Sequence, residues 1–553
     1  MHNGPLMGIN SVSPGAEGAA LSSQRSGGEA KAYERTIDSI CPICRTNIRG
    51  RIHEDQTTGA IVMHKTCPEH GDFQDRIHSS REDYVWRQGF LKDGTAPPMR
   101  DATETKRGCP QDCGLCRRHI NTPAIALIDV TNRCNLRCPI CFAAADATGR
   151  VFEPPFEDIV RIMKHFRDIR PQPPMTLQLS GGEPTLREDL PRIVREGVKL
   201  GFEHIIITTN GLKMTDIEYC RDLARAGVNA VYLQFDGLEP RTYERTRGVD
   251  LVGKKLRVVE NWRAVNKERL KETGRPGAGL ALIPTIARGL SDHEIPAIID
   301  FALSHLDVVV AVVFQPVSLC GRIGPGEVTK MRITAADLMA EIDRHTNSVG
   351  HPWYPVSAVS EFAKIIDWFD GADTVEFSCH PDCGFANWLI KNEKTGALES
   401  LKHYVDMDKA LSVSKAMWDR IVADGKQAGA GVLFRKWLKL KYLLQIRKSL
   451  VKKGVATTLL TRLIRSPGYP TVESFMFGPS VMIGCMHFQD AYNLDTERVR
   501  RCLVHYGVYH PGLDKVLEIP FCTYNTLHRE RIENELSVLR PGNRTAAPAI
   551  SAP

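Results

Sequence analysis

The chain has 553 residues, which is too long for one ordinary domain and predicts two to four folded units. Its composition, 42% hydrophobic and 25% charged, is that of an ordinary soluble globular protein, and it has no run of about 18 apolar residues that would predict a transmembrane helix. The net charge of +7 is mild for this length, so its distribution along the chain matters more than its sum.

Sixteen cysteines are the unusual part of the composition. The N-terminal residues show no basic segment followed by an apolar run, so we expect no secretory signal and a cytoplasmic protein. Because the cytosol keeps thiols reduced, the cysteines predict metal sites rather than disulfides. Residues 1–33 and 540–553 are rich in small and polar residues and are predicted to be disordered.

The first predicted folded unit, residues 34–120, begins as a small metal ribbon. Cys41 and Cys44 form a C-x2-C pair, an alternating segment follows, and Cys67 opens the sequence CPEHGDF. Two cysteine knuckles around a strand-like stretch are typical of such ribbons. The fourth ligand is either His70 or a residue from a distant segment. Buried cysteines without a metal are the alternative.

Two groups of three cysteines share one spacing. Both follow the pattern C-x3-C-x2-C: Cys109, Cys113 and Cys116, then Cys134, Cys138 and Cys141. Three thiolates this close can hold three corners of a cubane iron–sulfur cluster. The residues after the second trio, FAAADATG, contain no Cys or His, so one iron would stay open to an outside ligand. A structural zinc knuckle or three core cysteines are the alternatives.

The context of the second trio separates it from the first. It follows a strand-like run directly and leads a repeating strand–helix pattern. The strand-like runs are Ala124–Val130, Met175–Leu179, His204–Thr209, Ala230–Phe235, Gly279–Ile286 and Val308–Phe314. The helical runs are Phe156–Ile169, Asp189–Leu200, Asp216–Ala226, Arg241–Arg263 and Asp292–Ser304. Six such units predict an α/β fold, a partial (β/α)6 TIM-type barrel over residues 121–325. The first trio is then interpreted as an auxiliary iron–sulfur cluster.

Polar residues follow several of these predicted strands. They are Ser180, Gly181, Gly182, Glu183, Thr209, Asn210, Gln234, Asp236 and Gln315. Sites in β/α folds gather at the carboxyl ends of the strands. Glycines allow close backbone approach to a ligand, and a carboxylate such as that of Glu183 can bind an ammonium group. A plain turn is the alternative at Asn210–Gly211.

The remaining unit, residues 326–539, carries scattered cysteines. These are Cys379, Cys383, Cys485, Cys502 and Cys522. Together they predict one more cluster, closed by a C-terminal α+β domain. Cys220 lies on a helical run and is not counted as a ligand. The role of Cys320, beside the predicted barrel site, stays open, and so does the division of the other cysteines among sites.

One stretch without cysteine stands apart. Val432–Lys453 contains eight Lys and Arg residues, no acidic residue, and many leucines. As a helix, its first half separates basic from apolar residues, but Lys441 and Lys448 fall into the apolar stripe of the second half. Long lysine side chains tolerate such positions at a membrane surface, so we expect contact with anionic lipid headgroups. A packed helix with a basic solvated edge is the alternative, and no nucleic-acid partner is expected.

The second cysteine trio, Phe142 directly after it, and the GGEP sequence resemble the radical S-adenosylmethionine (SAM) superfamily. That resemblance implies that the open iron of a [4Fe-4S] cluster binds SAM and that Gly181, Gly182 and Glu183 hold its amino group. The flanking cysteine motifs, from CPIC through GCPQDCGLC to PFCTYN, resemble the tetraether lipid synthase branch. This branch implies two auxiliary clusters and a rubredoxin-like mononuclear iron, or zinc.

The resemblance implies a radical mechanism. An electron from a reductase or ferredoxin-type donor reduces the cluster and breaks the sulfonium bond of SAM, and the 5′-deoxyadenosyl radical takes hydrogen from a membrane lipid chain. Two such activations would join chain ends by a carbon–carbon bond, at the inner membrane face. A radical SAM enzyme acting on a peptide or small metabolite is one alternative. A non-catalytic iron–sulfur carrier or zinc-ribbon binding protein is the other.

Overall fold

The computed structural model describes residues 32–94, 105–114, 116–145, 149–170, 172–274, 277–323, 328–346, 353–370, 377–392, 395–396, 398–423, 431–451 and 480–539. The segments predicted to be disordered lie almost wholly outside these ranges. Across the described residues, no helix combines the length and the apolar character needed to cross a bilayer.

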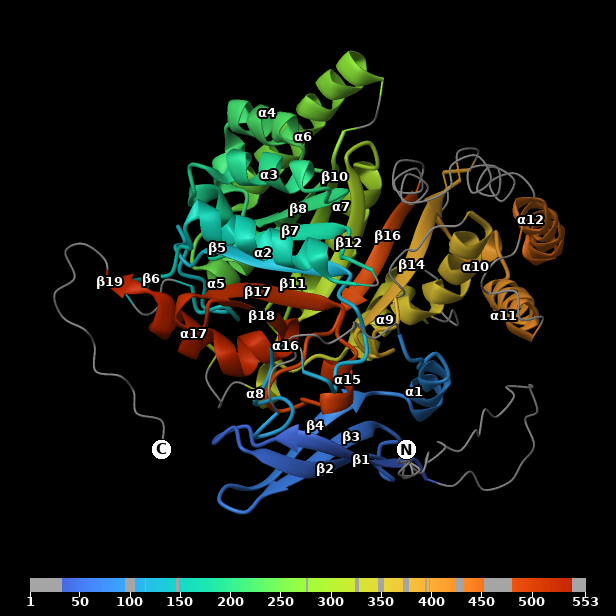
Figure 1. The fold of residues 1–553 in the computed structure, drawn as a ribbon, viewed down its shortest axis with the longest axis horizontal. Helices are drawn as coiled ribbons and strands as arrows, with labels where there is room; N and C mark the ends of the chain where they lie inside the picture. Colours follow the sequence, from blue (N-terminus) through green and yellow to red (C-terminus); the bar gives the residue numbers. More distant parts are fainter. Residues whose placement is uncertain are drawn as a thin grey trace, which may run out of the picture.

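An antiparallel ribbon forms the N-terminal part (Figure 1). Its strands are β1 (Glu34–Ile40), β2 (Asn47–Glu54), β3 (Ile61–Cys67) and β4 (Gly71–His78), and helix α1 (Arg81–Gln88) follows. Apolar side chains that alternate along the strands pack beneath Tyr84 of α1. Cys41 and Cys44 come after β1, and Cys67 ends β3, so the turns bring both knuckles to one end of the ribbon. The predicted ribbon is confirmed.

The predicted β/α units form the centre of the molecule. Six parallel strands lie in chain order: β5 (Ile125–Thr131), β7 (Thr176–Gly181), β8 (His204–Thr209), β9 (Ala230–Gln234), β10 (Gly279–Ile283) and β12 (Val309–Pro316). The connecting helices are α2 (Phe156–Asp168), α3 (Leu190–Lys199), α4 (Ile217–Ala226), α5 (Pro240–Arg247), α6 (Val252–Thr273) and α7 (Ile295–Ser304). Their apolar faces and the strands share one large core. The predicted alternation of parallel strands and helices is confirmed.

One predicted helix is divided. The sequence predicted a single helix over Arg241–Arg263, but α5 ends at Arg247 and α6 begins at Val252. Gly248 has φ 83°, a left-handed conformation that ends a helix and that glycine adopts without steric cost. The break matters for the site because it turns Arg247 and Lys255 toward the strand ends.

Strands from the C-terminal part extend this sheet at both edges. β16 (Ser480–Met486) pairs parallel to β12, and β14 (Gly384–Lys391) pairs antiparallel to β16. At the other edge β17 (Val504–His510) pairs parallel to β5, with β18 (Lys515–Pro520) beside it. The boundary predicted at residue 325 therefore does not divide the sheet, because later strands satisfy the backbone groups of its edges. Among the described residues the sheet stays open and closes no barrel.

The other elements connect or flank this sheet. Its short additional strands are β11 (Thr285–Ile286), β13 (Tyr354–Pro355) and β15 (Leu398–Ser400), whereas β6 (Arg150–Val151) and β19 (Val538–Leu539) form a separate two-stranded sheet. The remaining helices are α8 (Val328–Met331), α9 (Ala335–Thr346), α10 (Ser360–Asp370), α11 (Met407–Ala423), α12 (Val432–Ile446), α15 (Thr496–Arg500), α16 (Phe521–Thr523) and α17 (Arg529–Leu536). Helices α10, α11 and α12 pack together at one side of the molecule (Figure 1).

Candidate functional site

The second cysteine trio lies on the loop that leaves β5 at its carboxyl end. A segment after β12 holds this loop from the opposite side. The backbone N–H of Arg322 donates to the Cys141 carbonyl at 3.1 Å, and its Nη1 donates to the Cys138 carbonyl at 3.1 Å. Gly321 has φ 68°, and a Cβ there would lie 2.2 Å from the Cys141 oxygen. Only glycine permits this contact, which joins the first and sixth strands of the unit around the thiols.

The three thiols form an electrostatically coupled group. Burial raises the pKa of Cys134 to about 12, and the nearby Glu183, Cys138 and Cys141 add to this rise. Burial also raises the pKa of Cys138. Thiols in such a setting ionise readily only when a cation binds them. In a cubane each thiolate binds a different iron, so this donor set fits three corners and would leave the fourth iron to an outside ligand.

Glu183 of the GGEP sequence joins the ends of β7 and β8. Its side chain is buried, and its Oε1 accepts hydrogen bonds from the backbone N–H of Thr185 at 3.1 Å and from Thr209 Oγ1 at 2.7 Å. Its Oε2 accepts the backbone N–H of Asn210 at 2.7 Å. The structure thus assigns this carboxylate to positioning the strand ends. Binding of the SAM amino group by Glu183 stays a prediction.

The glycines of the same motif allow a close backbone approach. A Cβ on Gly182 would lie 2.3 Å from the Arg133 carbonyl oxygen, and one on Gly181 would lie 2.0 Å from that of Thr131. The Gly182 N–H donates to the Thr131 carbonyl at 2.7 Å. The motif therefore lies directly against the start of the cysteine loop, and the close approach seen here is to the backbone of that loop.

A buried charged cluster lies at the ends of β8 and β9. Asp236 is paired with Arg247 of α5, with Nη2 and Oδ1 2.8 Å apart. Burial opposes ionisation of Asp236, but Arg247 brings the pKa of its carboxyl below the ordinary value. Lys255 of α6 donates from Nζ to the Asn210 carbonyl and to Gln234 Oε1, both at 2.6 Å. Burial lowers the pKa of Lys255 to about 7.

Sequence reasoning missed Arg247 and Lys255. Both belong to a stretch with several other basic residues, and nothing in the sequence separates them from an exposed helix face. The role of the remaining predicted residues stays a prediction, and the structure gives only their positions. Ser180 and Gln315 are half-buried on β7 and β12. Phe142 is partly exposed beside Cys141.

The ribbon contains a compact metal-ligand group. Cys41, Cys44, Cys67 and His70 place one ligand atom each within 4.8 Å of the others. His70 Nδ1 lies 3.7 Å from Cys41 Sγ and 3.6 Å from Cys67 Sγ. Hydrogen bonds from Thr46 lower the pKa of the Cys44 thiol to about 6. Of the two fourth ligands considered from sequence, the structure brings His70 to the thiols, and three thiolates with one imidazole suit tetrahedral zinc.

A second thiol group, termed here the four-thiol site, contains Cys379, Cys383, Cys502 and Cys522. Burial raises the pKa of Cys502 to about 12, and the neighbouring Cys522 and Cys383 contribute. The pKa of Cys379 is also raised, by burial and by the neighbouring Cys383 and Cys502. The buried Arg498 interacts with Cys383 and Cys522 and supplies a positive charge. Four convergent thiols beside a buried cation fit a fully ligated, negatively charged cubane.

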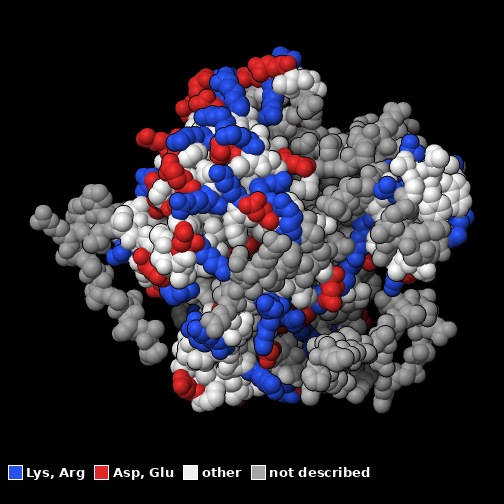
Figure 2. Space-filling model, viewed as in Figure 1, with Lys and Arg blue, Asp and Glu red and all other residues white. Residues whose placement is uncertain are grey.

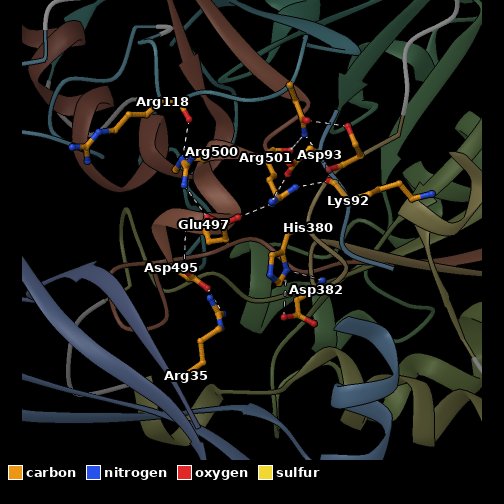
Figure 3. Close-up of polar contacts among 12 residues, drawn as sticks. Arg35, Lys92, Asp93, Arg118, His380, Asp382, Asp495, Glu497, Arg500 and Arg501 are labelled. Carbon is orange, nitrogen blue, oxygen red and sulfur yellow. Dashed lines mark hydrogen bonds and ion pairs between the residues drawn. The ribbon is translucent and has the colours of Figure 1, made fainter. Parts of the chain in front are cut away.

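Helix α15 fixes the position of this site. Figure 3 shows that residues of α15 and its two flanks lie at the centre of a polar network. Asp495, at its N-terminus, pairs with Arg35 of the ribbon at 2.6 Å. After the helix, Arg501 pairs with Asp93 at 2.8 Å. Arg500 donates to the Arg118 carbonyl at 2.9 Å. The network thus links the ribbon, the segment after α1 and the first cysteine trio to the residue that precedes Cys502.

The first trio lies next to the four-thiol site. Cys113 Sγ is 3.3 Å from the hydroxyl of Thr523, the neighbour of Cys522. The pKa of Cys113 is raised by burial and by Cys109, Cys116 and Cys502. Two cysteine groups that are far apart in sequence therefore meet in the fold.

Three cysteines stand outside these groups. Cys485 lies in the main core on β16, and its electrostatic neighbour is Arg87, so the structure does not bring this predicted ligand to the four-thiol site. Cys220 is buried and its Sγ lies 3.2 Å from the Met214 carbonyl oxygen. Cys320 is close to two groups. Its Sγ lies 3.8 Å from the carbonyl oxygen of Phe142, which follows the second trio, and Cys522 of the four-thiol site contributes to the rise of its pKa.

Comparisons with known proteins agree with this geometry. The radical SAM superfamily model matches residues 128–302. A model described as the HMPTM N-terminal zinc ribbon domain matches residues 33–79. The 7,8-dihydro-6-hydroxymethylpterin dimethyltransferase of Methanocaldococcus jannaschii is 37% identical over 510 residues, which cover 91% of this chain and 96% of the relative.

Two further matches are partial. A probable GTP 3′,8-cyclase of Methanothermobacter marburgensis is 33% identical over 186 residues, covering 32% of this chain and 54% of that relative. The crystal structure of Streptococcus suis SuiB bound to precursor peptide SuiA is 18% identical, with a TM-score of 0.34, and the match covers 42% of this chain and 47% of that one.

These matches correct one expectation. The relative that is similar over nearly its whole length carries the name of a pterin dimethyltransferase, so the resemblance to tetraether lipid synthase is not supported by it. The radical SAM assignment, with the [4Fe-4S] cluster and SAM that it implies, is confirmed. The chain belongs to the radical SAM superfamily, in the family of 7,8-dihydro-6-hydroxymethylpterin dimethyltransferase.

Proposed function

We propose that this radical SAM enzyme transfers methyl groups to a pterin, with 7,8-dihydro-6-hydroxymethylpterin as the acceptor. The observation that carries the proposal is the 37% identity to the dimethyltransferase over 96% of its length. Similarity over 91% of this chain favours the same overall chemistry more strongly than the SAM site alone does. This proposal replaces lipid chain coupling as the first candidate.

Residues at the carboxyl ends of the strands would hold the cluster and SAM. A [4Fe-4S] cluster with SAM, when bound, supplies a 5′-deoxyadenosyl radical by one-electron cleavage. Cys134, Cys138 and Cys141 would hold three of its irons. The backbone of Gly181 and Gly182 would approach SAM closely. The half-buried strand-end residues Ser180, Asn210, Gln234 and Gln315 would line the ligand-binding edge.

The buried charges beneath this edge would keep it rigid. Asp236 and Arg247 neutralise one another, and Lys255 ties the end of β8 to that of β9. Such pairing fixes the edge before the ligand binds, which lowers the reorganisation needed in the reaction.

We further propose that the other cysteine groups hold metals. The four-thiol site would hold one auxiliary [4Fe-4S] cluster, and Cys109, Cys113 and Cys116 would hold three irons of a second. The Cys41, Cys44, Cys67 and His70 group would hold zinc rather than a rubredoxin-like iron, since rubredoxin sites use four thiolates. Metal analysis of His70→Ala should show less zinc with unchanged iron. A loss of iron instead would contradict the zinc assignment.

The test of methyl transfer uses anaerobically reconstituted enzyme with dithionite, SAM and the pterin. We expect 5′-deoxyadenosine and a pterin heavier by one or two methyl groups, detected by mass spectrometry. Because the methyl donor is not identified by the site, the assay is run with SAM alone and with cell extract that contains small-molecule methyl donors. Formation of deoxyadenosine without any methylated pterin under both conditions would reject the pterin as substrate while leaving the radical SAM assignment intact.

Coupling of lipid chains is the second candidate, and the exposed apolar side of α12 favours it. The same reconstituted enzyme is offered membrane lipids with saturated chains. Products with joined chains, together with an unaltered pterin, would establish this candidate in place of the first. Lipid mass spectrometry of a deletion strain would test it in the cell.

A further inference from the structure

Helix α12 has two apolar sides. One is packed: Leu438, Tyr442 and Ile446 are buried against α10 and α11. The hydroxyl of Tyr442 lies 2.8 Å from that of Ser414 on α11, in a buried contact. This side explains why the helix is held on the protein. It also separates the buried Leu438 from the apolar residues that the same helix leaves exposed.

The other side is exposed. Leu433, Trp437, Leu440 and Leu444 have exposed fractions of 84%, 53%, 58% and 56%. Their spacing of four, three and four residues places them in one line along the helix. We name these four residues the α12 stripe. Contiguous apolar patches are uncommon on the surface of soluble proteins and mark interaction sites. Figure 2 shows a broad surface without charge where α12 lies in Figure 1, with basic residues at its margins.

Basic residues border the stripe. At 100° per residue, Lys436 lies on one side of it and Lys441 on the other. The Lys441 Nζ is 5.5 Å from the centre of the Trp437 ring. Arg447 and Lys448 are exposed at the end of the helix, and no Asp or Glu occurs between residues 432 and 451. The sequence-based concern that Lys441 interrupts the apolar side is resolved, because the stripe is narrow and the lysine lies at its edge.

We propose that the α12 stripe docks the enzyme on an anionic lipid bilayer, with the helix lying in the plane of the headgroups. An apolar line flanked by cations on both sides matches acyl chains below and anionic headgroups around them. A second copy of this face would bring its cations against like charges. Nucleic acid would leave the leucines and the tryptophan without an apolar partner. The proposal concerns where the enzyme sits and does not depend on which substrate it uses.

The experiment is vesicle co-sedimentation of the full-length protein. The vesicles contain phosphatidylcholine alone or with phosphatidylglycerol. We expect wild type to bind the anionic vesicles more tightly and to lose binding at high salt. Leu440→Ser/Leu444→Ser and, separately, Lys436→Gln/Lys441→Gln should each weaken binding by roughly tenfold or more. Leu513→Ser is the matched apolar control, because Leu513 is 61% exposed elsewhere. Lys199→Gln/Lys271→Gln is the matched basic control.

Two further measurements keep the outcome clear. Deoxyadenosine formation by each variant reports on folding and on the proposed function, independently of vesicle binding. Quenching of Trp437 fluorescence by brominated lipid, compared with Trp437→Phe, reports on insertion of the stripe itself. The proposal is overturned if the wild-type protein does not bind anionic vesicles, or if the Leu440→Ser/Leu444→Ser variant binds them as wild type does. It is also overturned if that variant changes only the oligomeric state, from a dimer in solution to a monomer.

Discussion

We call the loop after β5 that carries Cys134, Cys138 and Cys141 the SAM loop. Its thiols all lie between residues 134 and 141, whereas those of the four-thiol site come from three segments between residues 379 and 522. The first group needs only one loop at the end of β5. The second needs β17 and β18 to be paired at the sheet edge and α15 to be fixed by ion pairs. The difference teaches that a motif spacing identifies a local site, while a site assembled over long distances depends on the whole fold. Four changes test this contrast, in order of expected effect.

Replacing Cys134, Cys138 and Cys141 together with Ala should abolish the SAM site alone. We expect deoxyadenosine formation to fall to background while iron at the other thiol groups is retained, because those sites share no ligand with the loop. Iron analysis and a deoxyadenosine assay measure the two effects. Cleavage of SAM at the normal rate by this variant would contradict the assignment of the trio.

Cys502→Ser should remove the cluster of the four-thiol site. The loss should be roughly one to four iron atoms per chain, since a cubane without one of its thiolates loses either the unliganded iron or the whole cluster. SAM cleavage should continue, and methylated product should fall strongly. Cys485→Ala is the control, because Cys485 lies in the main core and no other thiol contributes to the rise of its pKa. If Cys485→Ala loses the same iron and Cys502→Ser does not, the four-thiol site is misassigned.

Arg247→Met should destabilise the edge that carries the SAM loop. It leaves the buried Asp236 carboxylate without its partner, which should reduce the free energy of unfolding by about 3–5 kcal/mol. Denaturant unfolding of the reduced protein measures the change. Arg225→Met removes a pair in which both side chains are largely exposed and should cost less than about 1 kcal/mol. Equal losses for the two variants would show that burial of the Asp236 pair is not decisive.

Lys255→Met should change the pH dependence of stability. The pKa of Lys255 is lowered to about 7 by burial, so between pH 7 and its ordinary pKa the unfolded chain binds one more proton than the folded one. Wild-type stability should therefore gain about 1.4 kcal/mol per pH unit from this group above pH 7. The variant lacks that gain, so its free energy of unfolding should fall further below that of wild type as the pH rises from 7 to 9.5. A difference between the two proteins that stays constant over this range in thermal unfolding would contradict the lowered pKa.

Most of the central fold could be predicted from the sequence. Strands β5, β8, β10 and β12 are buried at almost every residue, whereas β7 and β9 alternate buried and half-buried residues. Each is a short, largely apolar segment that alternates with an amphipathic helix, and both patterns are local. The ribbon was predictable for the same reason, because its knuckles and turns are close in sequence. The division of the Arg241–Arg263 prediction into α5 and α6 was missed because one glycine, Gly248, was read as part of the helix.

The amino-acid sequence by itself determined the SAM loop, the GGEP edge and the three cysteines of the ribbon, because each is a set of residues whose spacing imposes its geometry. It left the fourth ribbon ligand open, and the fold brings His70 to that position. Only the tertiary structure decided which distant cysteines converge, that Cys485 stays apart, and that Arg247 and Lys255 reach the strand ends. It also decided which side of α12 is packed and which is exposed. The physical reason is that contacts between distant segments follow from how strands pair at the sheet edges and how helices pack. The spacing of residues along the sequence determines neither.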